Sequence, residues 1–409
     1  MTLNAATVIA AGVFWLGLLF GIALYGERHP GFLKKRWAIV YTLSLGVHCT
    51  SWTFYGTITQ ASRSGWWLPP TFVGVIALYL VGIAVIMRLV RLAQEYNASS
   101  LADLIAARLG RNGGLAALVT AVTLLGIVPY IALQLKAVAM SYGILVYHDQ
   151  GLPAWQDSVL YVALLMALFA MLFGTRRASA VAHNRGLVLA VAFESVFKLV
   201  AMLAVGTLAL GANLGAVATD PARVPDTGGF PALILLGALA MFTMPHQFHT
   251  GVVECRDAND VRVSRWLFPL YILLISLPIL PLARLGDARF ALAGVKPDLY
   301  MLVLPLTEGR NGLALLAFLG GLSAATSMVI VATYALSLMI ANHFVAPLRA
   351  RGGWMRSRGD LRVEVLNQRR AAILAVLLLA WAYSRALVGN NALADIGAQS
   401  FAALATLAP

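Results

Sequence analysis

The segment YTLSLGVHCTSWTFYG, Tyr41 to Gly56, places polar side chains where a membrane-spanning helix ordinarily has none. They follow Gly46 in a short run: His48, Cys49, Thr50, Ser51 and Thr53. A helix that breaks near the middle of a bilayer can use such residues, because freed carbonyls and hydroxyl oxygens replace water around an ion or small solute. A tight contact between helices also favours small residues. These residues alone leave both interpretations open.

A second informative segment, GGLSAATSMVIVATYALS, begins with Gly320 and Gly321, which permit close approach of another backbone. Three hydroxyl residues follow at helical spacing: Ser323, Thr326 and Ser327. Hydroxyl oxygens gathered on one face, without a carboxylate, suit a singly charged hard cation such as sodium. Packing at a helix crossing is again the alternative.

Two opposite charges lie inside one apolar segment. Glu194 and Lys198 are four residues apart, carboxylate first, which places them on one face of a helix. Either charge alone would be costly in hydrocarbon, so we expect an intramembrane ion pair that faces the bundle interior. This pair serves either as a neutral packing device or in proton transfer or gating. Gln134 is a further polar residue inside a predicted span.

The composition defines the class of protein. Of 409 residues, 60% are hydrophobic and 11% are charged, and the mean hydropathy is +0.81. These values predict an all-α polytopic membrane protein. Hydrolase, nucleotide-cradling and dinucleotide motifs are absent from the sequence, so we expect no catalytic residues and no cofactor besides sodium. Eleven apolar segments are long enough to span: 5–25, 37–60, 68–92, 115–147, 155–173, 186–210, 230–249, 266–285, 313–344, 371–388 and 392–409.

The distribution of positive charge predicts the topology. With the N-terminus outside and the spans alternating, inner loops hold 21 of the 30 Lys and Arg residues and outer loops hold 7. This excess follows the positive-inside rule and accounts for the net charge of +13. We therefore expect a lipid bilayer as partner and no nucleic acid. In two long loops, 92–112 and 286–311, we expect short helices, the first capped by Ser99 or Ser100 and the second lying over the outer vestibule.

Several motifs occur in order along the chain: SLGVHCTSWTFYG, RGLVLAVAFESVFKL, MPHQFHTGVVE and GGLSAATSMVIVATYALS. With them the sequence resembles the solute:sodium symporter family, and more closely the version fused to the N-terminus of bacterial sensor histidine kinases (CbrA-type). The resemblance implies a leucine-transporter-like core of two inverted five-helix repeats, preceded by one extra N-terminal helix. Its boundaries would be 1–30 for the extra helix, 31–212 and 230–409 for the repeats, and 213–229 for an outer loop between them.

The resemblance also implies which residues form the sites. Sodium would lie between the second and ninth helices, at the backbone oxygens of Val47 and Thr50 and at Ser327 with Thr326 or Met328. Cys49 stands where some members carry an aspartate, and its neutral thiol is a poor sodium ligand. Thr53 and Phe54 match positions that face the solute, and we expect the full solute lining to be His48, Cys49, Ser51, Thr53, Phe54 and Gln134.

The function implied is that of a bacterial inner-membrane domain that binds a small organic solute, for example an amino acid such as histidine. In the parent protein it would act as the input module of a sensor histidine kinase and, through it, of a response regulator. A free-standing sodium-coupled symporter and a receptor module that never transports are the alternatives. Because the last apolar segment has no polar stop, we expect the natural chain to continue beyond Pro409 into the last spans and the kinase, where any enzymatic activity would lie.

Overall fold

The computed structural model describes residues 3–29, 31–146, 158–174, 183–210, 228–290, 292–351, 362–386 and 393–408. Every regular element within these ranges is a helix. The predicted outer loop 213–229 lies outside the described residues except for its last two positions.

The helices of the first half are α1 (Ala5–Arg28), η1 (Lys34–Arg36), α2 (Trp37–Ser44), η2 (Leu45–His48), η3 (Trp52–Gly56), α3 (Thr57–Ser64), α4 (Pro70–Leu80), α5 (Ile83–Glu95), α6 (Leu101–Arg108), α7 (Gly113–Val146), α8 (Ser158–Gly174) and α9 (Arg185–Leu210). Those of the second half are α10 (Phe230–Thr243), α11 (Pro245–Phe248), η6 (His249–Val253), α12 (Ala258–Ser276), α13 (Ile279–Phe290), η7 (Pro297–Leu299), α14 (Tyr300–Thr307), α15 (Asn311–Ile340), η8 (Ala341–Val345), α16 (Ala346–Arg351), α17 (Arg362–Ala386) and α18 (Leu393–Ala405).

The lengths of these helices fit a polytopic membrane protein. In the described part of the chain, six helices are long and apolar enough to cross a membrane, or eight if each bent pair is one span. The bent pairs are α4 with α5, at 72°, and α10 with the helical segment Pro245–Val253, which comprises α11 and η6, at 56°. Two shorter apolar helices, α8 and α18, and the interrupted segment from α2 to α3 correspond to the remaining predicted spans.

The first interruption arises because side chains compete with backbone carbonyls for the hydrogen bonds of the helix. After η2 the backbone of Cys49 turns away (φ −80°, ψ 88°), and helix resumes at Trp52. The Thr50 hydroxyl accepts the Trp52 N–H at 3.2 Å and so starts the next helix as a capping residue does. Small hydroxyl residues favour such local bonds over a continuous helix.

The second interruption has a different cause. Met244 precedes a proline and is extended (φ −76°, ψ 130°), the conformation that a following proline imposes. Pro245 then begins α11, where its missing N–H costs nothing. Both predicted spans, 37–60 and 230–249, are therefore interrupted in the structure.

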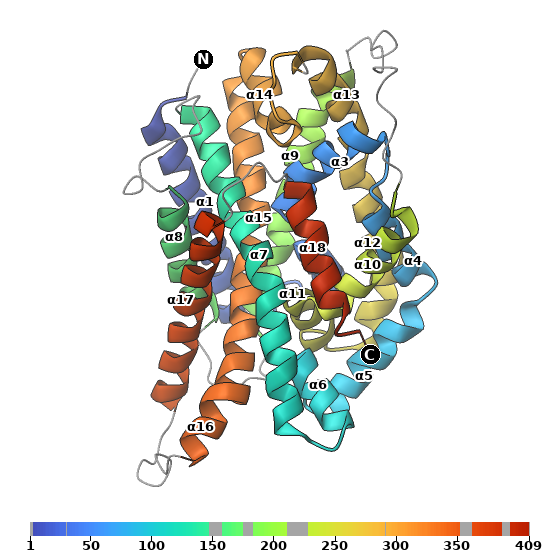
Figure 1. Cartoon of the computed structure of the whole chain (residues 1–409), viewed down its shortest axis with the longest axis vertical. Helices are drawn as coiled ribbons and strands as arrows, with labels where there is room; N and C mark the ends of the chain where they lie inside the picture. The colour runs from blue at the N-terminus through green and yellow to red at the C-terminus, as the bar shows by residue number, and fades with distance from the viewer. Residues whose placement is uncertain are drawn as a thin grey trace.

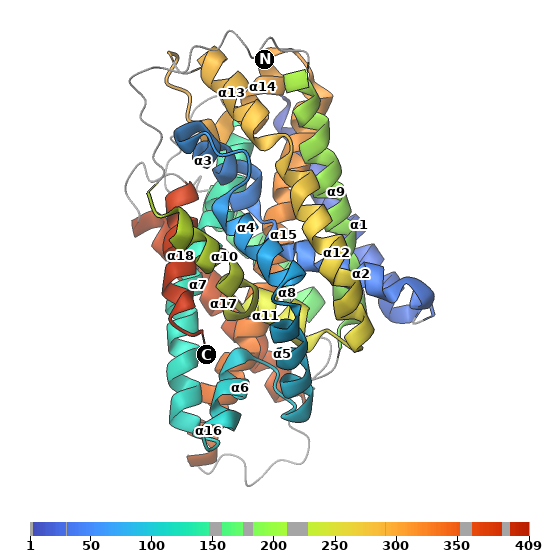
Figure 2. The same cartoon turned by 90° about the vertical axis from the view of Figure 1, so that its right-hand side faces the viewer.

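The helix pairs that join the two halves of the chain form two matching sets, in which corresponding helices of the first and second half change places. The pair α2–α12 has a counterpart in α10–α4, and the pair α7–α18 has a counterpart in α15–α9. Figure 2 shows α4 and α10 side by side near the middle of the molecule. This exchange is the contact pattern of inverted repeats, and α1 lies outside it, against α9. The residue boundaries 31–212 and 230–409 remain predictions.

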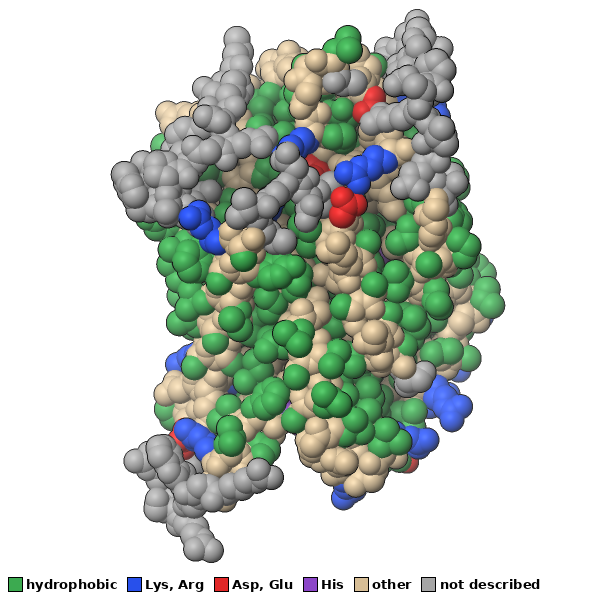
Figure 3. All heavy atoms as spheres, in the orientation of Figure 1, with side chains coloured by type: hydrophobic (Ala, Val, Ile, Leu, Met, Phe, Trp, Pro, Cys, Tyr) green, Lys and Arg blue, Asp and Glu red, His purple; other side chains and the backbone are tan. Residues whose placement is uncertain are grey.

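The molecule has two distinct ends (Figure 1). Helices α3, α13 and α14 lie at one end, called here the α14 end, and α5, α6 and α16 lie at the other, the α6 end. Both predicted loop helices are present: α14, and α6, whose start is capped by Ser100 accepting the Asp103 N–H at 3.1 Å. On the face drawn in Figure 3, hydrophobic side chains cover the middle and charged ones lie toward the two ends, as a bilayer requires.

Glycines set the distance between α4 and α10. A Cβ at Gly74 would overlap the carbonyl of Ile234, and a Cβ at Gly237 would overlap the backbone of Thr71. Because the obstructing atoms belong to backbone, they cannot move aside as a flexible side chain can. Small residues at such crossings are how membrane helices gain close packing without a hydrophobic driving force.

We expect Gly237→Ala to lower the free energy of unfolding by about 1–3 kcal/mol, the usual cost of overpacking. The matched control is Gly17→Ala on α1, where an added Cβ meets nothing within 4 Å. Thermal unfolding of the purified proteins in detergent measures the difference. Equal melting temperatures for the two variants would show that the α4–α10 spacing does not depend on this glycine.

Candidate solute and ion site

The side chain of Lys198 fills the break in the first segment. Lys198 lies on α9, is 0% exposed, and donates from Nζ to the carbonyls of Gly46 at 2.7 Å and Cys49 at 2.8 Å. Its Nζ also lies 3.4 Å from the hydroxyl of Ser327 on α15. An ammonium has three donors and no acceptor, so these three oxygens match its hydrogen-bonding capacity.

Glu194, one turn earlier on α9, turns to α15 instead. Its Oε1 accepts the Thr326 hydroxyl at 2.6 Å, and its backbone carbonyl lies 3.4 Å from the Ser323 hydroxyl. The three hydroxyl residues that the sequence singled out on this helix therefore all face α9. They are shared between the carboxylate side and the ammonium side of one buried polar cluster.

The predicted direct ion pair between Glu194 and Lys198 is corrected by these contacts. Although both residues are described, no N···O distance of 4.0 Å or less joins their charged groups. Their spacing does place them on one face of α9, but each side chain reaches a different element. The carbonyls at the break compete successfully for the ammonium, since a backbone carbonyl left unpaired in the membrane is costly.

The carbonyls that accept from Lys198 each lie one residue before the two that the resemblance assigns to sodium, and the sodium assignment itself stays a prediction. The resemblance placed those two at Val47 and Thr50, whereas the carbonyls of Gly46 and Cys49 receive the Lys198 ammonium. The Thr50 carbonyl instead accepts the Phe54 N–H at 3.1 Å, because helix has already resumed there. The difference is one residue at each position.

Gly46 lets the broken segment approach α9 closely enough for this contact. A Cβ at Gly46 would lie 2.5 Å from the Ser195 hydroxyl and 3.2 Å from the Tyr271 ring. The Tyr271 hydroxyl donates to the Ser195 carbonyl at 3.0 Å, which fixes α12 to the same point. The glycine therefore allows three elements to converge beside Lys198.

On the opposite side of the break, α7 supplies polar partners. The hydroxyls of Thr50 and Tyr130 are hydrogen-bonded at 2.8 Å. The side-chain oxygen of Gln134 accepts both the Ser51 N–H, at 3.0 Å, and the Ser51 hydroxyl. The break is thus held between a cation on α9 and two polar side chains on α7.

Several buried polar atoms near the breaks have no hydrogen-bond partner. Within the described part of the chain, they include Nε2 of Gln134, Nδ1 of His246, and both polar side-chain atoms of Gln247. All three residues are at most 1% exposed. His246 and Gln247 lie on α11, which packs against η2, and the His246 ring stacks near Tyr130 with centroids 6.3 Å apart. Buried polar groups normally find partners, so such a cluster is where a polar ligand can bind.

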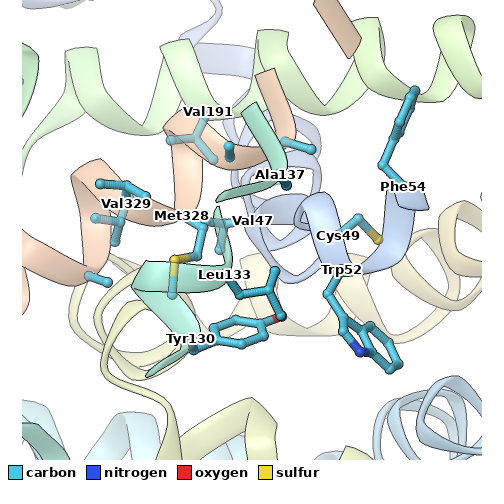
Figure 4. Packing of buried hydrophobic residues seen from close by; sticks show 14 of the residues in the cluster. Val47, Cys49, Trp52, Phe54, Tyr130, Leu133, Ala137, Val191, Met328 and Val329 are labelled. Carbon is cyan, nitrogen blue, oxygen red and sulfur yellow. The ribbon is translucent and has the colours of Figure 1, made fainter. Parts of the chain in front are cut away.

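Aromatic rings form the wall beside these groups. Trp52 lies 5.6 Å from Phe401 and 6.3 Å from Phe72, measured between centroids, and its indole donates to the Ala394 carbonyl at 3.1 Å. The His48 ring is 5.8 Å from Phe72. Figure 4 shows Trp52 and Tyr130 on one side of the broken segment, with Met328 and Val329 of α15 nearby.

Not all predicted solute-lining residues lie on that wall. His48, Ser51 and Gln134 border it, whereas Phe54 points away from Trp52 (Figure 4) and packs where a Cβ at Gly320 would sit. Thr53 lies beside the Cys49 thiol. Phe54 therefore helps to dock η3 against α15.

At the α14 end, polar and charged residues link segments that lie far apart in the sequence. The Asp298 carboxylate accepts from the Thr59 hydroxyl and from the Leu393 N–H, at 3.2 Å for the latter, and Arg63 pairs with Asp395 at 3.0 Å. Burial raises the pKa of Asp298, and these hydrogen bonds oppose the rise. Toward the α6 end there is a small hollow, lined by Ser99, Ser100, Leu101, Thr123, Thr243, Pro245, Phe248, Ala335 and Met339.

A buried carboxylate fastens the α6 end. Both oxygens of Glu254 accept the Asn184 N–H, at 2.9 and 3.0 Å, and His249 and His183 lie 3.4 and 3.5 Å away. The Asn184 amide donates to the Tyr334 hydroxyl on α15 at 3.0 Å. Burial alone would raise the pKa of Glu254, but these partners outweigh it and lower that pKa to about 2. The carboxylate is therefore ionised at neutral pH.

Comparison with known proteins agrees with this architecture. No family model and no curated protein matches the sequence. A solved structure of a Na⁺-coupled sialic acid symporter, in a substrate-bound outward-open state, aligns over 98% of this chain and 86% of its own, with a TM-score of 0.68 and 12% identity. A variant of the manganese transporter of Eremococcus coleocola aligns over 90% and 76%, with a TM-score of 0.54 and 18% identity.

These similarities establish the fold. The chain has the leucine-transporter-like architecture, with inverted five-helix repeats after one extra N-terminal helix. At these identities they carry no solute, ion or partner over to this protein. The breaks described above lie in the first helix of each repeat of that fold.

Sequence reasoning did not single out Tyr130, His246 and Gln247 as lining residues. The available signal was Pro245, which breaks an apolar segment and is followed at once by two polar residues.

We expect Gly46→Ala to displace η2 from α9, weakening the Lys198 contacts and lowering the melting temperature. Ser195→Gly, introduced with it, removes the obstructing hydroxyl and Cβ and should restore part of the loss. Gly251→Ala is the matched control in the second broken segment, because its Cβ would meet only Leu45, at 3.5 Å. A double variant no more stable than Gly46→Ala alone would contradict this account of the approach.

Glu254→Gln should destabilise the protein by about 1–3 kcal/mol at pH 7, since charged hydrogen bonds are lost in a buried site. A lowered pKa contributes stability above the unfolded value, near 4.3, and loses it as the pH falls toward about 2. The difference from wild type should therefore be constant from pH 7 to 5 and shrink below. Melting temperatures across this range test it, with the exposed Glu95→Gln as control. A difference that grows on acidification would exclude the ionised carboxylate.

Proposed function

We propose that this chain is a transporter-type membrane domain that binds a small polar organic solute between its two broken segments. One observation carries the proposal: in the described part of the chain, Nε2 of Gln134, Nδ1 of His246 and both polar side-chain atoms of Gln247 are buried without a hydrogen-bond partner, on helices α7 and α11 that pack against the first broken segment. An unsatisfied buried polar group costs free energy, and a solute with donors and acceptors would recover it. Sites at the crossing of discontinuous helices are typical of secondary transporters.

The chemistry of the lining points to a class of solute. Amide and imidazole groups offer both donors and acceptors, and Trp52, Phe72 and Phe401 offer flat apolar surfaces. The buried ammonium of Lys198 is already engaged by carbonyls. A neutral or zwitterionic solute with a planar part, such as the amino acid histidine, fits this combination better than a multiply charged anion does.

The wider role follows from the resemblance of the sequence. We infer that the domain lies in a bacterial inner membrane with its N-terminus outside, and that it serves as the input module of a sensor histidine kinase acting on a response regulator. The excess of basic residues in the predicted inner loops supports this orientation. A free-standing symporter and a receptor that does not transport remain the alternatives.

Gln247→Leu should reduce binding of L-histidine at least about tenfold while leaving the protein as stable as wild type or more so, because it removes two unsatisfied polar atoms. The control is Gln94→Leu, since Gln94 donates to the Cys255 carbonyl at 3.2 Å and lies at the α6 end. That change should lower stability and spare binding. Scintillation proximity binding and thermal unfolding measure the two quantities. Unchanged binding in a destabilised Gln247→Leu protein would contradict the assignment of Gln247 to the solute site.

Uptake of labelled L-histidine into proteoliposomes separates the transporting and receptor alternatives. Accumulation above the external concentration under an imposed ion gradient identifies a coupled transporter. Binding to the same preparation without accumulation identifies a receptor module.

A further inference from the structure

The oxygens around Lys198 Nζ are those that a monovalent cation would need. Two are backbone carbonyls at the end of a half-helix, Gly46 and Cys49, and one is the hydroxyl of Ser327 on α15. Half-helix carboxyl ends carry partial negative charge, and unwound carbonyls at such ends coordinate ions in transporters with broken helices. The sequence placed a sodium site between these same two elements.

The ammonium and a metal ion cannot share this position. Nζ lies within 2.8 Å of both carbonyl oxygens, which leaves no room for a second cation bound to them. Two positive charges so close in a buried site also repel strongly, because little water is present to screen them. The residues at the break therefore do not fit a sodium ion while the charged Lys198 side chain is in place.

Several titratable groups surround the amino group of Lys198. The titratable groups that interact with Lys198 are Glu194 on its own helix, His48 at the end of η2, Cys49 directly after it, and His246 on α11. Tyr271 of α12 lies beside the same point, where its hydroxyl donates to the Ser195 carbonyl. Among these groups Glu194 is the only carboxyl, and its Oε1 is bound by Thr326.

We propose that Lys198 is a built-in cation that occupies the ion position of this fold, so that the break is held together without sodium. The tether is covalent, so the amino group stays at the site, whereas a dissolved ion would have to bind from solution. This inference deepens the proposed function and relies on it for the nature of the neighbouring solute site. Its test uses sodium alone and no solute, so the two ideas can fail separately.

The first measurement is the melting temperature of the wild-type protein in detergent, in NaCl, KCl and choline chloride at equal ionic strength. Ligands that bind only the folded state raise this temperature. The proposal expects the same value in all three salts, because the ion position is filled. A sodium-specific increase in wild type would overturn it.

The second measurement uses variants in which the ammonium of Lys198 is removed. Lys198→Ala removes the ammonium and leaves three oxygens and space for an ion, so sodium should raise its melting temperature where KCl and choline chloride do not. Lys198→Met removes the charge but fills the space, and it should show no sodium effect. Adding Ser327→Ala to Lys198→Ala should reduce the sodium effect by removing one oxygen ligand.

A folded Lys198→Ala protein that sodium does not stabilise would show that these oxygens are not a cation position. Equal sodium effects in Lys198→Ala and Lys198→Met would contradict the proposal in the same way. If Lys198→Ala does not fold in any salt, the wild-type comparison decides by itself.

Discussion

A helix that breaks inside a bilayer must find partners for its freed carbonyls, and in this protein the ammonium of Lys198 supplies them. The other features around the site depend on that contact. Gly46 admits the close approach of α9, Tyr271 fixes α12 to the same turn, and Ser327 places α15 against it. The polar run that would be unstable against lipid is thus enclosed by elements from both halves of the chain.

The two breaks of the fold are satisfied in different ways. In the first, side chains on α9 and α7 take up the carbonyls and hydroxyls, through Lys198 and Gln134. In the second, a proline ends the helix and the polar residues that follow, His246 and Gln247, are left without partners. Most of the polar groups at the first break therefore have partners within the protein, although Nε2 of Gln134 has none among the described residues, and the second break leaves more hydrogen-bonding capacity unused.

The fold was largely predictable, because hydropathy and helix-breaking residues act locally. The polar run after Gly46 indicated the first break, and GGLSAATS on α15 indicated the facing helix. The partners of Lys198 were not predictable. Its spacing from Glu194 suggests a pair within one helix, and only the three-dimensional packing shows that carbonyls from a distant element compete for it. Which carbonyls stay free for Lys198 depends on where the helical hydrogen bonds resume, with the Phe54 N–H. The periodicity of the sequence does not reveal that position. Unpaired atoms, as on Gln247, can be recognised only once every neighbour is placed.

The hydrogen bond from Trp52 to the Ala394 carbonyl joins residues 342 positions apart, and it has a consequence for synthesis of the chain. When α9 enters the membrane, Gly46 and Cys49 have already been synthesised, so their carbonyls can accept hydrogen bonds from the Lys198 ammonium at once. Glu194 has to wait for Thr326, and Trp52 for the last helix. A nascent chain therefore lacks the Thr326 partner of Glu194 for 132 residues of synthesis and the Ala394 partner of Trp52 for 342. The solute site matures only when translation has passed α18.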